Sequence, residues 1–115
     1  MLILPPKHDG LIFAETHNLF STYFDIPLIT PAVTQGAIYI IRNPLDVVIS
    51  VSDHFGLEMD KAVDFVNNPN GSSAPTETMV RQIFSSWTKN VEHWTLNPTV
   101  SVLAVRYEDL HEHPA

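Results

Sequence analysis

The chain lacks cysteine, long apolar runs and an excess of basic residues, and each shortage excludes a class of protein. Without cysteine it can form neither disulfide bonds nor a thiolate metal site, so the composition suits a reducing compartment and we expect a cytoplasmic protein. The longest apolar runs, such as Ala37 to Ile41, are too short to cross a bilayer, and the first residues lack the pattern of a signal peptide. We therefore expect no membrane partner.

Basic residues are scarce. The 115 residues include six Lys and Arg against thirteen Asp and Glu, which gives a formal net charge of −7. The cations are spread singly along the chain, without the basic stripe that follows a phosphate backbone, so nucleic acid is not an expected partner. Because the overall field repels anions, an anion must be held by a local arrangement around one or two cations. The hydrophobic content of 44% is normal for one small folded domain.

Short apolar runs alternate with helical patterns along the chain. The runs at residues 11–14, 37–41 and 100–105 predict strands, and the run at 37–41 lacks polar alternation, as in a parallel strand covered on both faces. Helices are predicted over residues 44–55, 59–66 and 76–96, with loops at 18–36 and 67–75. This order predicts an α/β fold, with a parallel sheet flanked by helices and ligand contacts at the carboxyl ends of the strands.

The three predicted strand ends carry His17, Arg42 and Tyr107. Arg42 is followed at once by Asn-Pro, which suits the start of a helix, so a guanidinium and free backbone N–H groups meet near one point. Such a point can bind phosphate or sulfate, and Ser50 on the same helix could add a hydroxyl donor. The alternative is structural: Arg42 forms a local bridge with Asp46, and Ser50 is a small packing residue.

Three segments in order resemble the family of sulfotransferases that use 3′-phosphoadenosine-5′-phosphosulfate (PAPS). The first is Tyr-Ile-Ile-Arg-Asn-Pro-Leu-Asp-Val-Val-Ile-Ser at residues 39–50, with Arg and Ser eight apart. The second runs from Ser86-Trp87 to Trp94, and the third is Arg-Tyr-Glu-Asp-Leu at residues 106–110, followed by Pro114. The resemblance covers roughly residues 10 to 115. It implies a P-loop-NTPase-like sulfotransferase fold and sulfuryl transfer from PAPS to a small-molecule hydroxyl or amine.

The resemblance also implies roles for individual residues. Arg42 and Ser50 would hold the 3′-phosphate of PAPS, and Tyr107 would contact its adenine side, although a core tyrosine is the structural alternative. Glu15-Thr16-His17 is similar to the family's Lys-Thr-His segment, whose histidine takes the acceptor's proton, a task that suits an imidazole. Without that likeness, His17 would be read as a surface or capping residue. The family chemistry requires no metal, and the histidines at 111 and 113 are expected to be solvated.

Some of the family's pattern is missing. The segment Pro-Lys-Ser/Ala-Gly-Thr-Thr, which holds the 5′-phosphosulfate, has no match in residues 1 to 36, and Glu15 stands where the family commonly has Lys. A Gly-x-x-x-x-Gly-Lys-Ser/Thr loop is missing as well, which argues against a nucleotide kinase. We expect residues 1–115 to form a partial domain that transfers sulfuryl groups weakly or not at all on its own. The alternative is a noncatalytic nucleotide-binding or interaction module; the acceptor and the oligomeric state are not predicted.

Overall fold

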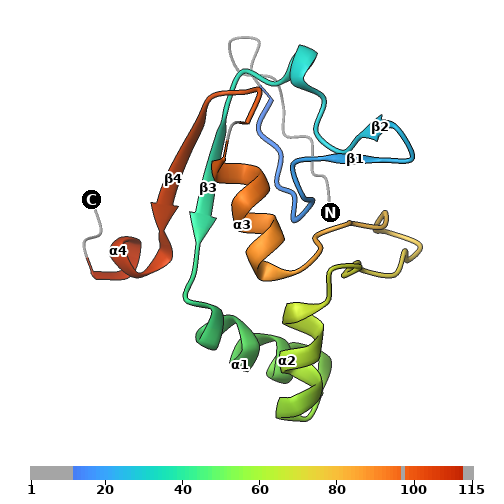
Figure 1. Ribbon diagram of the computed structural model, residues 1–115, viewed down its shortest axis with the longest axis vertical. Coiled ribbons are helices and arrows are strands. Elements are labelled where there is room, and N and C mark those ends of the chain that lie inside the picture. Colours follow the sequence, from blue (N-terminus) through green and yellow to red (C-terminus); the bar gives the residue numbers. More distant parts are fainter. Residues whose placement is uncertain (1–11, 97, 113–115) are drawn as a thin grey trace.

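The computed structural model describes residues 12–96 and 98–112, and a pair of parallel strands forms the larger of its two sheets (Figure 1). Strand β3 (Ala37–Ile41) pairs with β4 (Val102–Arg106) in a register that sets Ala37 opposite Val102 and Ile41 opposite Arg106. The prediction for residues 37–41 is confirmed, and the predicted last strand forms slightly later along the chain. The two strands therefore end side by side, and the residues that follow them share one edge of the sheet.

The two helices predicted after β3 are present. Helix α1 (Pro44–Phe55) begins where the Asn43 side chain accepts a hydrogen bond from the N–H of Leu45 at 2.9 Å, and it ends at Gly56 in a left-handed conformation with φ 63°. Asn at the cap and Pro at the first helical position favour this start. Helix α2 (Met59–Asn67) buries Ala62 and Val66 from its predicted apolar face. In Figure 1 the two helices lie together beyond the carboxyl end of β3.

The long helix predicted over residues 76–96 is wrong in its first half. Helix α3 spans only Trp87–Thr95, and it begins where the Ser86 side chain accepts a hydrogen bond from the N–H of Lys89. The preceding segment is irregular because its polar groups bond elsewhere: Gln82 N–H donates to Ser73 Oγ, and Ile83 forms a bridge with Ser72. These tertiary hydrogen bonds replace the local bonds of a helix, although the apolar spacing of residues 80–91 favours one.

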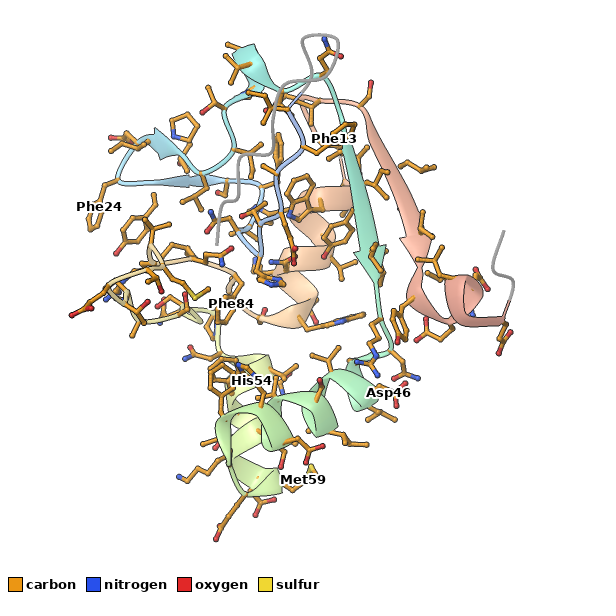
Figure 2. The ribbon with its side chains drawn as sticks, turned by 180° about the vertical axis from the view of Figure 1, so that it is seen from behind. Phe13, Phe24, Asp46, His54, Met59 and Phe84 are labelled. Atoms are coloured by element: carbon orange, nitrogen blue, oxygen red, sulfur yellow. The ribbon has the colours of Figure 1, made fainter. Side chains whose placement is uncertain are left out.

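The strand predicted at residues 11–14 is also wrong. Leu11 lies outside the described residues, and residues 12–14 belong to no strand. The next segment was predicted as a loop, and it contains a small hairpin of β1 (Thr22–Tyr23) and β2 (Ile26–Pro27), with a 3₁₀ turn at Pro31–Val33. Phe24 lies at the tip of this hairpin, away from the sheet (Figure 2). The parallel sheet of the described residues therefore has two strands, not three.

Helix α3 covers one face of the parallel sheet. The Trp94 ring stacks on Tyr39 at 5.4 Å between centroids, and Phe20 meets it edge-on at 5.1 Å. The Tyr39 hydroxyl donates to Asn90 Oδ1 at 2.7 Å, and burial raises the pKa of Tyr39 to about 12. Trp94, with 6% of its surface exposed, is the largest residue of the described hydrophobic core. The face of the sheet that contacts α3 is thus a packed aromatic cluster.

Among residues 12–96 and 98–112 nothing packs closely on the other face of the sheet, which corrects the prediction that β3 is covered on both sides. Ile38 and Ile40 of β3 are 70% and 53% exposed, and Leu103, the partner of Ile38, is 62% exposed. Residues 38 and 40 point away from α3 because side chains alternate along a strand. A short helix that was not predicted, α4 (Tyr107–Glu112), follows β4. Among the described residues no helix has both the length and the apolar character needed to cross a membrane.

Candidate functional site

Arg42 occupies the junction between the end of β3 and the start of α1. Its guanidinium carbon lies 4.6 Å from the centre of the ring of Tyr107, the first residue of α4. The Trp87 indole N–H donates to the Arg42 carbonyl oxygen at 3.1 Å, so α3 holds the backbone of this junction. The Nε atom of Arg42 is buried and has no hydrogen-bond partner. A buried donor without a partner is costly, and it is the kind of group that a ligand satisfies.

A cavity of about 350 Å³ opens at this junction. It lies at the lower end of the range of small-molecule sites, about 300–1,000 Å³. Its lining combines two guanidinium groups, one carboxylate and an indole ring: Ile41, Arg42, Asn43, Pro44, Trp87, Arg106 and Glu108. Asp46, in the first turn of α1, lies near this edge of the sheet (Figure 2). The side chains in the cavity carry two positive charges and one negative charge, in a chain that is acidic overall.

Glu108 joins the two strand ends. One of its carboxylate oxygens accepts a hydrogen bond from the N–H of Asn43, the residue that caps α1, at 2.7 Å. This bond is the main reason why the pKa of Glu108 lies below its ordinary value of 4.5, and the nearby Arg106 and Arg42 lower it further. Glu108 thus binds from α4 one of the backbone N–H groups that the start of a helix leaves without a partner.

Replacing Glu108 by Gln should make the melting temperature less dependent on pH in the acidic range. A carboxyl group whose pKa is lowered by folding stabilises the protein fully above its ordinary pKa, and this stability is lost as the pH falls through the folded value. Melting curves of the wild type and Glu108→Gln should therefore differ most above pH 4.5 and converge below it. A constant difference between pH 7 and pH 3 would contradict this. Glu112→Gln, which removes a carboxylate from the same helix, is the control.

The structural alternative, in which Arg42 forms a local bridge with Asp46, does not match the geometry of this junction. Among the described residues, no ion pair joins Arg42 to Asp46; the ion pairs found there are those of His17 with Glu15 and of Arg106 with Asp109. Ser50 is exposed on α1 and does not line the cavity. Two of the four predicted site residues, Arg42 and Tyr107, are therefore brought into contact, and Ser50 lies outside their immediate surroundings.

His17 lies in an irregular segment, not at a strand end as predicted. Its backbone N–H donates to Oε1 of the buried Gln82, which also accepts from the Thr16 hydroxyl at 3.2 Å. The imidazole is 70% exposed, with Nε2 3.9 Å from a Glu15 oxygen. Within the described part of the chain, no hydrogen bond or ion pair connects His17 to Arg42 or Tyr107. The backbone of this segment is thus fixed while its imidazole faces solvent.

Arg106, Glu108 and Trp87 line the cavity but were not among the predicted site residues. Predicting Arg106 and Glu108 would have required the parallel pairing of β3 with β4. Once residues 37–41 and 102–106 are paired, Arg106 stands beside Ile41, and Glu108 follows two residues later at the same edge. Side chains at the carboxyl ends of neighbouring parallel strands meet, as the rule for ligand sites in α/β sheets states.

The fold and the site define an α/β protein with a cationic cavity at the carboxyl edge of a parallel sheet. Comparison with protein families identifies it further: the model of the sulfotransferase domain matches residues 14–115. The chain therefore belongs to the sulfotransferase domain family, as the sequence motifs indicated. Searches among curated proteins and among solved structures found no match.

Proposed function

We propose that the chain binds PAPS at the cavity beside Arg42 and takes part in sulfuryl transfer to a hydroxyl or amine of a small molecule. The observation that carries this proposal is the buried, unpartnered Nε of Arg42 at the start of α1, in a chain of the sulfotransferase domain family. A guanidinium beside a helix amino end suits a phosphate group, because both supply N–H donors to its oxygens.

The residues present fit the 3′-phosphate end of PAPS. Arg42 supplies the unpartnered donor, and the ring of Tyr107 holds its guanidinium from one face. The indole of Trp87 gives the cavity an aromatic wall, which suits a nucleotide. Ser50, exposed on α1, would add a hydroxyl donor if the ligand extends along that helix. When bound, PAPS supplies the sulfuryl group, which passes to the acceptor while its bond to the 5′-phosphate oxygen breaks.

His17 is the residue proposed to take the proton from the acceptor. An exposed imidazole is open to an acceptor molecule, and the hydrogen bonds to Gln82 fix the backbone that carries it. One observation favours weak transfer by these 115 residues alone. Glu15 places a carboxylate beside the imidazole, where it opposes an anionic donor.

Incubation of the purified chain with labelled PAPS and a simple phenol tests the catalytic part of the proposal. We expect slow product formation that still exceeds the rate without protein, because the Glu15 carboxylate beside the proposed base opposes an anionic donor. Rapid transfer would contradict the expected slow rate. If that transfer were lost in His17→Ala but kept in His54→Ala, a variant at an exposed position of α1, it would still identify His17 as the base. Nucleotide binding without any transfer would instead favour a noncatalytic binding module.

A further inference from the structure

We infer that Arg106 is a second anion-binding residue of this site and contributes to selectivity for a nucleotide that carries a 3′-phosphate. This inference rests on the proposed function, because it assigns an additional residue to the phosphate end of the same cavity. It arises from the pairing of β3 with β4 and from the cavity lining, which together bring two guanidinium groups to one place.

The position of Arg106 follows from the register. Ile41 and Arg106 are direct partners at the ends of parallel strands, so their side chains lie on the same face, and both line the cavity. Arg42 follows Ile41 by one residue and lines it too. The two arginines therefore approach the cavity from adjacent strands, and one phosphate between them could accept N–H donors from both.

The hydrogen-bonding capacity of Arg106 is largely unused. Its only ion pair within the described residues is with Asp109, where Nε lies 3.7 Å from a carboxylate oxygen, too far for a hydrogen bond. Both side chains are more than half exposed, at 68% and 52%, and pairs of this kind stabilise proteins little. Asp109 thus holds Arg106 only weakly, and the guanidinium can turn toward an anion at small cost.

The charge of the cavity indicates which anion fits. Glu108 lines it as well and offsets one of the two arginines, although its carboxylate is engaged by the N–H of Asn43. With Arg42 alone, the carboxylate would leave the cavity neutral and a phosphate monoester would gain little from entering. With Arg106 included, the cavity keeps a net positive charge. Both Arg42 and Arg106 are therefore needed for the net positive charge that makes this cavity attractive to a phosphate dianion.

Calorimetric titrations with 3′,5′-ADP and with 5′-AMP, which lacks the 3′-phosphate, test this assignment. Arg106→Gln should weaken the binding of 3′,5′-ADP by about five- to tenfold and change that of 5′-AMP by less than about twofold. Arg106→Lys, which keeps the charge but loses the planar fork, should fall between. Asp109→Asn should strengthen 3′,5′-ADP binding about two- to threefold, because it removes the competing carboxylate.

Arg81→Gln is the matched control, since Arg81 is exposed and does not line the cavity. The melting temperature of Arg106→Gln should equal that of the wild type, which separates ligand binding from a structural role. If the wild type binds 3′,5′-ADP, two results for Arg106→Gln would overturn this inference without affecting the proposed function. The variant could bind 3′,5′-ADP as well as the wild type does, or it could lose as much affinity for 5′-AMP as for 3′,5′-ADP. A wild type that does not bind 3′,5′-ADP would overturn the proposed function itself.

Discussion

Replacing Arg42 by Gln is expected to weaken the binding of 3′,5′-ADP by about tenfold to a hundredfold. Arg42 immediately precedes the residue that caps α1, its Nε is buried without a partner, and the Tyr107 ring lies against its guanidinium. A neutral amide can replace neither the charge nor the paired N–H donors. Isothermal titration calorimetry measures the loss directly.

Two control variants separate the charge of Arg42 from the planar shape of its guanidinium and from a general loss of positive charge. Arg42→Lys keeps one positive charge but not the planar group over Tyr107, so its affinity should lie between those of Gln and the wild type. Arg81→Gln removes the same charge from an exposed position outside the cavity and should leave binding unchanged. If Arg42→Gln and Arg81→Gln had equal affinities, Arg42 would not be part of the phosphate site.

The largest loss of stability is expected for Trp94→Ala. Trp94 stacks on Tyr39, meets the edge of Phe20, and donates its indole N–H to the Asn18 carbonyl oxygen at 3.0 Å. Removing a buried tryptophan leaves a cavity and an unpaired carbonyl, which together cost about 3–5 kcal/mol of the free energy of unfolding. Because a small domain has only about 5–15 kcal/mol in total, the variant should be close to unfolding at 37 °C.

Chemical denaturation followed by far-ultraviolet circular dichroism measures this change. Leu96→Ala, at an exposed position at the end of the same helix, should cost less than about 0.5 kcal/mol. Trp94→Phe keeps an aromatic ring but loses the indole donor, so it should lie between the two. A loss below about 1 kcal/mol for Trp94→Ala would mean that the aromatic cluster between α3 and β3 does not hold the sheet in place.

The segment from β3 to α2 was predictable because local and tertiary preferences agree there. Residues 37–41 favour a strand on composition alone, and the cap at Asn43, the following Pro44 and the stop at Gly56 favour the observed helix. The segment at residues 76–86 differs, since its apolar spacing favours a helix while Gln82 and Ile83 bond to distant parts of the chain. One signal of the true start was available: Ser86 immediately precedes Trp87 and caps α3.

The candidate site was predictable only in part, and for a related reason. Arg42 and Tyr107 were predicted because each follows a predicted strand and lies in a segment that resembles the sulfotransferase motifs, and the two side chains are in contact. Arg106 and Glu108 required the pairing of β3 with β4, which no local pattern reveals. The surroundings of His17 were mispredicted because hydrogen bonds to Gln82, 65 residues away, fix its segment in place of a strand.

Titration of the wild-type chain with 3′,5′-ADP tests whether the junction of β3 and α1 is a phosphate site. We expect saturable binding of one nucleotide per chain, weaker binding of 5′-AMP, and a decline in affinity as salt screens the arginines. The absence of binding, or equal binding of 3′,5′-ADP and 5′-AMP, would contradict it.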